Sequence, residues 1–564
     1  MNRLGGTAPP RSFLSDLAAG WRPWALLAAL CVALFLPGLS AMPPLDRDEA
    51  RFMQATRQML ESGDFVDIRF QDEARNKKPA GIYWLQAAAV AAFSAPASNA
   101  AWPYRLPSVL GATLAVLLTF AGGAPLVGRP GALLAAALLA SSLLLIAEAH
   151  LAKTDAVLLA TIVAAQLALG RVYGDARRAV PSRRRHAAAF WAAQGLGILI
   201  KGPVAPLISL ATILALGIAD RRWSWLARLR PAWGVPLLLA IAGPWLVAIE
   251  WKTGGAFGGE AVGHDLLGKL LGAQESHGAP PGAYLLLAPA TMWPASAFLG
   301  LAWISGWRAR TDVAARFLLA WLVPAWLIFE LIPTKLPHYV LPLYPALALL
   351  AGRALAGRTL AGTVERRLWL DGIVFALWIL VGAVLATGLI ALPIRLGHGF
   401  AVLSLVPALA AAAIAVGLAV RLRRGFTAGA VPLVAILAVL VAVPSFAALL
   451  PGLDTLWLSR SAAALVAAHP AAAPRPVDAV GYDEPSLVFL LHGALRATTP
   501  GRAAADLASG AATRALVSDR EEAAFRAALA ARGLAPAPLG TASGIDYSRG
   551  GALRRLTLYA GPAG

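Results

Sequence analysis

Residues 24–52 read WALLAALCVALFLPGLSAMPPLDRDEARF, an apolar run followed directly by a charged segment. The apolar part, 24–40, is long enough to be a first membrane span. Five of the six residues from Asp46 to Arg51 are ionisable. Charges beside a lipid surface are costly unless they are paired, hydrated or used, so this segment is either a well-hydrated loop or part of a functional site.

The composition of the whole chain indicates a polytopic membrane protein. Of its 564 residues 58% are hydrophobic and 14% charged, and the mean hydropathy is +0.66. These values lie outside the range of ordinary soluble domains. The net charge of +19 comes from short basic clusters between apolar runs. That distribution is typical of cytoplasmic loops and argues against nucleic-acid binding.

Apolar runs of spanning length predict about thirteen transmembrane helices. They lie near residues 24–40, 105–122, 131–148, 156–171, 186–200, 203–219, 232–250, 284–306, 313–332, 338–356, 368–392, 400–420 and 428–448. The first span is interpreted as uncleaved, with its N-terminus inside.

A shorter apolar segment at 80–95 decides the topology. If it spans, the basic loop 171–187 and the clusters at 220–230, 307–310 and 421–424 fall outside, against the positive-inside rule. If it lies along the membrane surface as a juxtamembrane helix, all four fall inside. The second topology is predicted; in the alternative, 80–95 spans and another run does not.

With this topology the unusual polar residues gather on the outer face. The outer loops are 41–104, 149–156, 201–203, 251–283 and 333–339. The inner loops carry mostly arginine.

After about residue 450 the long apolar runs end and shorter segments begin. Short β-like runs at 477–482, 513–519 and 553–561 alternate with helical stretches around 484–493 and 520–533. We expect a transmembrane domain over 1–449 and a small outer α/β domain over 450–564. The single cysteine, Cys31, lies in the first apolar run, which excludes an intramolecular disulfide and a thiolate metal cluster.

Cations, carboxylates and tyrosines of the outer loops form a candidate site. Lysine and arginine suit a lipid-linked phosphate, and a carboxylate suits a general base or a contact to a sugar hydroxyl. Taken singly, each lysine could instead extend to the lipid headgroups. The residues that carry this hypothesis are Asp48, Glu49, Arg51, Lys78, Lys153, Asp155, Lys201, Lys335, His338, Tyr339 and Tyr344.

The outer loop 251–283 raises the possibility of a divalent metal. His264, Asp265, Glu275 and His277 fall within fourteen positions, but their spacing matches no specific metal pattern. Contacts to a polar substrate or an ordinary loop are the alternatives. No essential cofactor is expected, and His264, Glu275 and His277 are the candidate metal ligands.

Several short motifs together resemble one known family. They are Asp-Glu-x-Arg-Phe at 48–52, Lys-Lys-Pro-Ala-Gly-Ile-Tyr-Trp at 77–84, Arg-Leu-Pro-Ser at 105–108, Lys-Thr-Asp-Ala at 153–156, Lys-Gly-Pro at 201–203, Glu-Ser-His-Gly-x-Pro-Pro at 275–281 and Lys-Leu-Pro-His-Tyr at 335–339. In this order they resemble the aminoarabinose (lipid A) transferase branch of the protein O-mannosyltransferase-related GT-C glycosyltransferases. The resemblance covers about residues 24–350 and extends more weakly to the rest.

The resemblance implies the GT-C fold and transfer of a sugar from undecaprenyl phosphate to lipid A or another lipopolysaccharide acceptor. It implies a bacterial inner-membrane enzyme, with its site and C-terminal domain on the periplasmic side, and we expect it to act as a monomer. By resemblance Asp48 is the catalytic carboxylate, and Arg51 and Lys78 lie near the donor phosphate. Further substrate contacts are implied or expected at Glu49, Tyr83, Asp155, Lys201, His277, Lys335, Tyr339 and Tyr344.

One departure from the family pattern leaves the donor sugar open. Many aminoarabinose transferases have an acidic residue before the Lys-Pro pair, where this chain has Lys77. The extra cation could accommodate a uronic acid as well as 4-amino-4-deoxy-L-arabinose, and a hexose is a further alternative. A transporter or flippase for a lipid-linked sugar is the rival class, although transporters usually place their polar groups near the midplane of two related halves.

Overall fold

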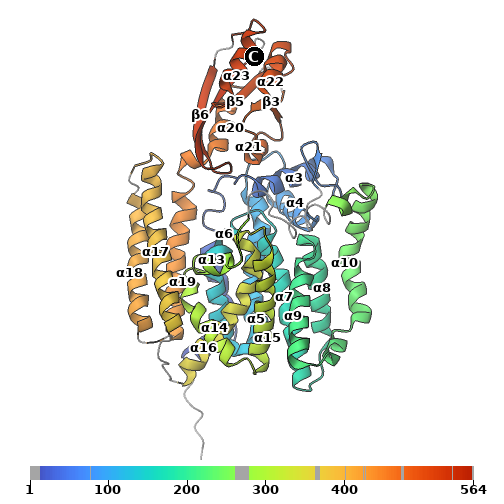
Figure 1. Cartoon of the computed structure of the whole chain (residues 1–564), viewed down its shortest axis with the longest axis vertical. Helices are drawn as coiled ribbons and strands as arrows, with labels where there is room; N and C mark the ends of the chain where they lie inside the picture. Colours follow the sequence, from blue (N-terminus) through green and yellow to red (C-terminus); the bar gives the residue numbers. More distant parts are fainter. Residues whose placement is uncertain are drawn as a thin grey trace, which may run out of the picture.

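The computed structural model describes residues 13–75, 78–260, 278–361, 369–399, 402–423, 425, 427–471, 475–535 and 538–561. A bundle of long helices forms one part of the molecule, and a smaller domain with a β-sheet stands on one end of it (Figure 1). This arrangement confirms the predicted fold class, a helical membrane part with a C-terminal α/β domain.

The helices of the bundle follow the predicted apolar runs. In chain order they are α1 (Phe13–Leu17), α2 (Arg22–Phe35), α5 (Trp102–Ala140), α6 (Leu143–Ala149), α7 (Asp155–Arg177), α8 (Arg184–Lys201), α9 (Val204–Asp220), η1 (Ser224–Leu229), α10 (Pro231–Lys252), α11 (Ala256–Gly258), α13 (Ala283–Thr291), η3 (Ala295–Phe298), α14 (Leu299–Arg308), α15 (Val313–Leu331), η4 (Pro337–Leu343), α16 (Tyr344–Ala361), α17 (Trp369–Arg395), α18 (Val402–Arg423), η5 (Ala428–Ala430), α19 (Val431–Pro444) and η6 (Ser445–Leu449).

Fewer helices meet a strict spanning criterion than the thirteen predicted runs. Within the described residues, seven are long and apolar enough to cross a membrane, or eight if the bent pair α13 and α14 is one span. The difference arises because several runs form shorter or interrupted helices. Helix α2 has 14 residues and α9 has 17, while α13 and α14 meet at an angle of 117°.

Two predicted runs, 105–122 and 131–148, lie in α5 and α6. Gly128 has a left-handed φ of 79° and breaks the helical path of α5. The chain returns from there to the end where it began, since Arg105 and the backbone of Ala152 bind the same Glu49 carboxylate. Glycine adopts a positive φ at little cost in free energy, because it has no Cβ atom. This explains why the chain reverses at Gly128.

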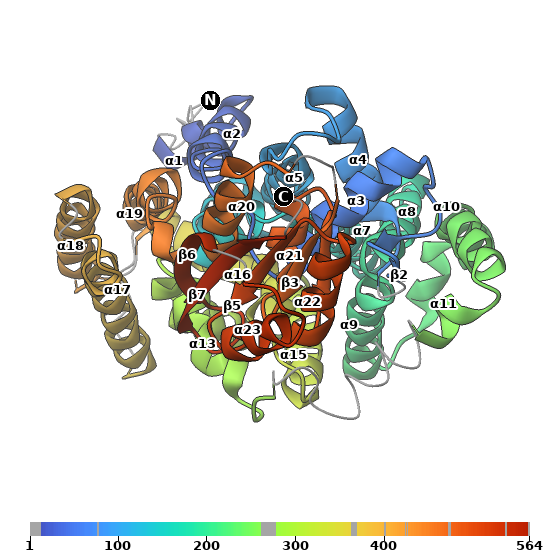
Figure 2. The ribbon, with the colours of Figure 1, turned by 90° about the horizontal axis from the view of Figure 1, so that it is seen from above.

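A thin layer lies between the bundle and the C-terminal domain (Figures 1 and 2). It contains α3 (Asp48–Ser62), the two-residue antiparallel strands β1 (Arg69–Phe70) and β2 (Glu73–Ala74), and α4 (Gly81–Phe93). Helix α3 ends at Gly63, which has the left-handed conformation typical of a helix C-terminus. Helix α4 corresponds to the predicted surface segment 80–95, and its 13 residues are too few to cross a bilayer.

The C-terminal domain has a five-stranded sheet in the order β4-β3-β5-β7-β6. Strand β3 pairs in parallel with β4 and β5, and β7 pairs antiparallel with β5 and β6. Its elements are η7 (Asp454–Leu456), α20 (Leu458–Ala468), β3 (Val477–Val480), α21 (Pro485–Leu490), β4 (Leu495–Thr498), α22 (Pro500–Ser509), β5 (Arg514–Ser518), α23 (Glu522–Ala530), β6 (Pro538–Asp546) and β7 (Ala552–Ala560). The predicted strands at 477–482, 513–519 and 553–561 are thus confirmed as β3, β5 and β7.

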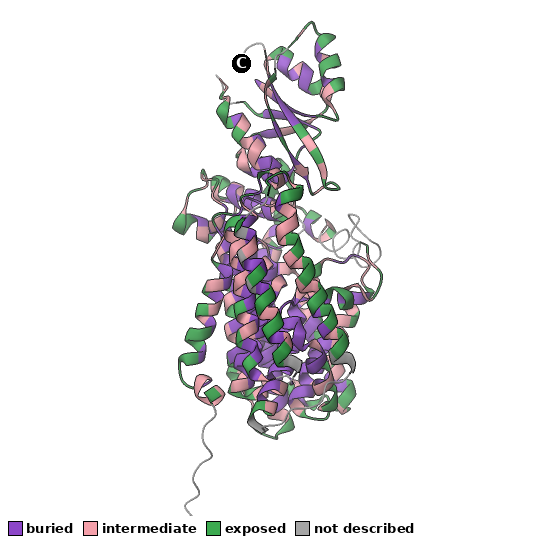
Figure 3. Cartoon of the chain, turned by 90° about the vertical axis from the view of Figure 1, so that its left-hand side faces the viewer, coloured by how far each residue is buried: buried purple, intermediate pink, exposed green. Residues whose placement is uncertain are grey.

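Burial separates the interior of the bundle from its outer surface (Figure 3). Helix α17 is apolar, yet side chains such as Ile379, Leu380 and Val384 are 48–62% exposed. A long, exposed apolar helix face in a polytopic protein suits contact with lipid tails.

Candidate functional site

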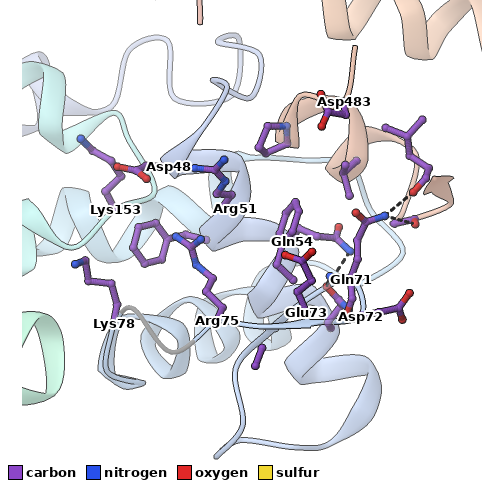
Figure 4. A pocket seen from close by; sticks show the side chains of 18 of the residues that line it. Asp48, Arg51, Gln54, Gln71, Asp72, Glu73, Arg75, Lys78, Lys153 and Asp483 are labelled. Atoms are coloured by element: carbon purple, nitrogen blue, oxygen red, sulfur yellow. Dashed lines mark hydrogen bonds between the residues drawn. The ribbon is translucent and has the colours of Figure 1, made fainter. Parts of the chain in front are cut away.

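A cavity of about 840 Å³ opens between the bundle, the α3 layer and the C-terminal domain. Figure 4 shows part of its wall. Its lining residues come from α3, the β1–β2 hairpin, the starts of α7 and η4, the end of α8, and the C-terminal domain. Segments from opposite ends of the sequence therefore share one polar space.

Eight of the predicted site residues line this cavity. They are Asp48, Arg51, Lys78, Lys153, Asp155, Lys201, His338 and Tyr339. The remaining predicted residues have other positions, described below.

Asp48 is the first residue of α3 and its side chain is exposed to the cavity. Among the described residues, no hydrogen bond or ion pair holds the Asp48 carboxylate. The preceding residue, Arg47, has a φ of 64°, a conformation that is uncommon and costly for a residue with a side chain. The chain thus turns sharply into α3 at the residue that presents the carboxylate.

Arg51 lies one helical turn after Asp48, on the same face of α3. Figure 4 shows both side chains in the cavity wall, with Lys153 beside Asp48 and Lys78 below Lys153 in the view. No hydrogen bond or ion pair of Arg51 occurs within the described part of the chain. Its guanidinium is therefore available to an anionic ligand.

A network of charges closes the membrane-facing end of the cavity. The Lys153 ammonium lies 3.0 Å from Glu148 Oε1, and the Lys201 ammonium lies 2.5 Å from Asp155 Oδ1. The His338 ring bridges the two pairs, 3.6 Å from Glu148 and 3.8 Å from Asp155. Burial lowers the pKa of Lys153, but the carboxylates of Glu148 and Asp155 outweigh it and hold that pKa above its usual value.

Tyr83 supports the cavity wall from behind. It is fully buried, and its hydroxyl accepts a hydrogen bond of 3.0 Å from Arg75 Nε. Burial raises the pKa of the Tyr83 phenol, and the Arg75 charge opposes that shift. The Arg75 guanidinium also lies over the ring of Phe52, 5.2 Å from its centroid. Tyr83 therefore positions Arg75, which lines the cavity, and does not line it itself.

Glu49 is buried beneath the cavity and does not line it. Its two carboxylate oxygens accept hydrogen bonds of 2.8 and 2.9 Å from Arg105, which is also fully buried. They also accept from the backbone N–H groups of Leu45 and Ala152. Glu49 thus ties the start of α3 to α5 and to the residue before Lys153, a structural position next to the predicted substrate contacts.

Lys335 and Tyr344 also lie outside the cavity. The Lys335 ammonium donates to the Ile332 carbonyl at 2.6 Å, and the Tyr344 hydroxyl lies 2.5 Å from Thr291 Oγ1. Both side chains are nearly or fully buried. Helix η4 starts at Pro337, and its residues His338 and Tyr339 line the cavity, whereas Lys335 and Tyr344 do not.

The candidate metal ligands His264, Glu275 and His277 lie outside the described residues, as does His277 in its predicted substrate role. In the part of the chain that the structure describes, no three His, Cys, Asp or Glu side chains are grouped to hold a metal. A divalent metal at those positions stays a prediction.

The C-terminal domain forms hydrogen bonds with the segment just before Asp48. The Asp46 backbone N–H donates to the Tyr547 hydroxyl at 3.0 Å, and the Ser486 hydroxyl donates to the Asp46 carboxylate. Arg47 donates to the Ser548 carbonyl. Two residues on the N-terminal side of Asp48 are thus anchored by residues about 440–501 positions away in the chain.

A second set of contacts fixes α3 and the hairpin tip. The buried Arg57 donates to the Phe489 carbonyl at 2.5 Å, and its guanidinium lies 4.0 Å from the centre of the Phe489 ring. Gln71, at the tip of the hairpin, donates from Nε2 to the carbonyls of Gly493 and Leu495 at 3.1 and 2.5 Å. Sequence reasoning missed these contacts, because partners so far apart leave no local pattern.

Other residues of the site did carry a signal in the sequence. Glu148 is a carboxylate at the end of an apolar run, and Arg105 lies in one of the recognised motifs. An ionisable residue at the edge of a span usually has a partner or a function. Gln54, Gln58 and Arg75 of the α3 layer had no such signal.

Comparison with known proteins supports the resemblance drawn from the motifs. A family model described as dolichyl-phosphate-mannose-protein mannosyltransferase matches residues 23–255. The chain is 29% identical over 342 residues to undecaprenyl phosphate-alpha-4-amino-4-deoxy-L-arabinose arabinosyl transferase 2 of Pseudomonas fluorescens (strain Pf0-1), covering 58% of this chain and 59% of that protein. It is 30% identical over 310 residues to the corresponding transferase of Pseudomonas aeruginosa (strain LESB58), covering 54% of each. The match spans less than two thirds of the length of either relative.

Solved structures share the fold over nearly the whole chain. ArnT from Cupriavidus metallidurans, in a crystal structure bound to undecaprenyl phosphate, aligns with a TM-score of 0.75 and 22% identity over 97% of this chain and 99% of that one. The oligosaccharyltransferase of Archaeoglobus fulgidus in its apo form aligns with a TM-score of 0.51 and 11% identity, over 90% of this chain and 70% of that one. The chain thus has the fold of the ArnT structure over nearly its whole length, and over a little more than half of its length its sequence is similar to the aminoarabinose transferases.

Proposed function

We propose that this protein is a membrane glycosyltransferase that moves a sugar from undecaprenyl phosphate to lipid A or another periplasmic glycan or lipid. The observation that carries the proposal is the unpartnered Asp48 carboxylate, which shares a cavity above the helical bundle with Arg51, Lys78, Lys153 and Lys201. The names of the relatives supply the donor class, a polyprenyl phosphate carrying 4-amino-4-deoxy-L-arabinose or a related sugar.

The cations are suited to the leaving group of such a transfer. As the bond between the anomeric carbon and the phosphate oxygen breaks, negative charge grows on the phosphate. Arg51 has no partner among the described residues, so its guanidinium can make two charge-assisted hydrogen bonds to that phosphate. Lys201 and Lys153 are each paired with a carboxylate and would contribute chiefly to the positive field around it.

The role of Asp48 depends on the acceptor atom. If the acceptor is a sugar hydroxyl, the carboxylate would take its proton as the oxygen attacks the anomeric carbon. If the acceptor is a lipid A phosphate, that oxygen is already anionic. Asp48 would then orient the donor or support the positive charge that develops on the sugar.

This function also assigns the sides of the membrane. Undecaprenyl phosphate donors and lipid A meet on the periplasmic face of the bacterial inner membrane in the family that the chain resembles. The cavity, the α3 layer and the C-terminal domain would therefore be periplasmic. The basic loops at the opposite end would be cytoplasmic, as the charge rule requires.

The test is mass spectrometry of lipid A and lipopolysaccharide core from cells that lack the gene, complemented with wild type, Asp48→Asn or Glu521→Gln. Glu521 is a matched acidic control in the C-terminal domain, outside the cavity. We expect a mass increment that identifies the sugar, returns with wild type and Glu521→Gln, and stays absent with Asp48→Asn. Lipid A and core that are unchanged in the deletion strain would contradict the proposed acceptor, and full complementation by Asp48→Asn would contradict the catalytic role.

A further inference from the structure

The cavity has two ends of different chemistry. Figure 4 shows Lys78, Lys153 and Arg51 at one end, and Asp72, Glu73 and Asp483 toward the other. The first end is closed by α7, α8 and η4 of the bundle, whereas the second lies between the hairpin and the C-terminal domain. A ligand that fills the cavity would meet cations near the membrane, and away from it carboxylates together with Arg496, which is itself ion-paired with Asp478 and Asp506.

Because the donor is linked to a lipid, it can occupy only one end of the cavity. The second end is left for the acceptor. A polyprenyl tail must remain among the membrane helices, so its phosphate can reach only the end of the cavity next to the bundle. The cations are at that end, and the donor sugar would follow the phosphate toward Asp48. The remaining space, which we call the outer end, is lined by the hairpin and by α21, β4 and the turn between them. This step rests on the function proposed above.

The hairpin side of the outer end offers hydrogen-bond acceptors. Glu61, Asp72 and Glu73 line the cavity with exposed side chains, and within the described residues none of these carboxylates has a hydrogen bond or ion pair. The buried Gln54 also lines it, and its Oε1 atom has no hydrogen-bond partner in the described part of the chain. These groups suit a ligand that donates hydrogen bonds.

The domain side of the outer end offers backbone groups. Strand β4 is at the edge of the sheet, paired only with β3. The Ala494 carbonyl faces β3, where it accepts from Val477 N–H, and the Leu495 carbonyl faces outward to Gln71. Because successive residues of a strand alternate, the backbone N–H and C=O of Ala497 also face outward, and Ala497 lines the cavity. Within the described residues no hydrogen bond involves these two Ala497 groups, so the strand edge offers a donor and an acceptor to the same cavity as the carboxylates.

We infer that the outer end binds the carbohydrate of the acceptor through its hydroxyl groups, and that the C-terminal domain thereby helps to determine which acceptor is used. Sugar hydroxyls both donate and accept hydrogen bonds, so they match carboxylates on one wall and a strand edge on the other. The C-terminal domain then forms one wall of the acceptor site. It also holds the α3 layer in place.

The test uses the purified full chain in lipid nanodiscs with two kinds of variant. Ala497→Phe fills the outer end, and the double variant Asp72→Asn, Glu73→Gln keeps the shape but removes both charges. Ala494→Phe is the matched control, because Ala494 is exposed nearby and does not line the cavity. Initial rates are measured with the undecaprenyl phosphate-linked sugar that the mass increment identifies, over a range of lipid A or of lipopolysaccharide from the deletion strain. Binding of undecaprenyl phosphate is measured separately by fluorescence titration.

The two readouts separate the possible outcomes. We expect the acceptor KM to rise roughly tenfold in both cavity variants, the loss expected for one or two hydrogen bonds, while undecaprenyl phosphate binding and the Ala494→Phe control change less than about twofold. An acceptor KM that stays at the wild-type value in both variants, with wild-type transfer intact, would overturn this inference and leave the proposed function standing. Absence of transfer by wild type to every acceptor would overturn the proposed function and the acceptor site with it.

Discussion

Glu49 and Arg105 form a fully buried ion pair directly beneath the candidate catalytic residue. Arg105 Nε and Nη2 donate to the two Glu49 oxygens at 2.8 and 2.9 Å, and Arg105 Nη1 and Nη2 donate to the carbonyls of Leu39, Met42 and Pro43. Since Asp48 precedes Glu49, this pair fixes where the candidate catalytic carboxylate stands relative to the bundle.

Removal of one partner of this pair should destabilise the protein strongly. Arg105→Ala leaves the Glu49 charge buried without a counter-ion, and a loss of about 3–5 kcal/mol is typical for such a change. We expect a clear fall in the thermal unfolding temperature of the detergent-solubilised protein. Arg502→Ala is the control, because Arg502 is 68% exposed in its pair with Asp506 and such surface pairs contribute less than about 1 kcal/mol. Equal unfolding temperatures for the two variants would contradict the structural role of Arg105.

Asp48→Asn should lower the rate of catalysis strongly and preserve the fold. The Asp48 side chain is exposed and has no partner among the described residues, so its amide replacement removes no stabilising contact. A general base typically contributes about 10²–10⁴-fold in rate, and we expect kcat to fall by that range. The check is the transfer rate of the purified variant, together with its unfolding temperature. A loss of folded protein would show that Asp48 has a structural role instead.

Arg51→Met should weaken donor binding more than acceptor binding. A hydrogen bond to a charged group is worth about 1.5–3 kcal/mol, which corresponds to a loss of roughly 10–100-fold in affinity. The measurement is titration of the nanodisc protein with undecaprenyl phosphate at low and moderate salt. Arg549→Met is a control cation in the C-terminal domain, outside the cavity. If Arg51→Met bound undecaprenyl phosphate with unchanged affinity, the phosphate site would not lie beside α3.

Docking of the C-terminal domain should strengthen as the pH falls. Burial raises the pKa of Asp46 to about 6, although the hydrogen bond from Ser486 opposes the shift. The folded state therefore takes up the proton more readily than the unfolded state, whose carboxyl has a pKa near 4. The stability gained on protonation is complete below about pH 4 and is lost as the pH rises through about 6, which amounts to about 1 kcal/mol between pH 7 and pH 5.

Asp46→Asn tests this linkage, because the amide remains neutral at every pH. Unfolding temperatures and the rate of proteolytic release of the C-terminal domain are compared between pH 5 and pH 7. We expect wild type to be more resistant at pH 5, and the difference to shrink in Asp46→Asn. The same pH dependence in both proteins would assign it to another group, such as Glu484, whose pKa burial also raises.

The sequence by itself determined the features that follow from local pattern and from membrane physics. Apolar length located the helices, the distribution of arginine indicated that 80–95 does not span, and alternating patterns identified β3, β5 and β7. Strands β4 and β6 were not predicted, because β4 is a short segment that contains the charged Arg496, and β6 carries Gly540 and Gly544 and little apolar alternation. Ordered motifs also indicated which loops share a site, since charge is costly at a membrane surface unless it has a use.

Only the tertiary structure decided which polar residues reach the cavity. Asp48 and Glu49 are neighbours in the sequence, yet successive positions of a helix point in different directions, so one lines the cavity and the other is buried against Arg105. The contacts of Asp46, Arg57 and Gln71 with the C-terminal domain join residues more than 400 positions apart. Such pairs depend on how two separately folded parts dock, and that docking is set by packing and hydrogen bonds between surfaces that have no common pattern in the chain.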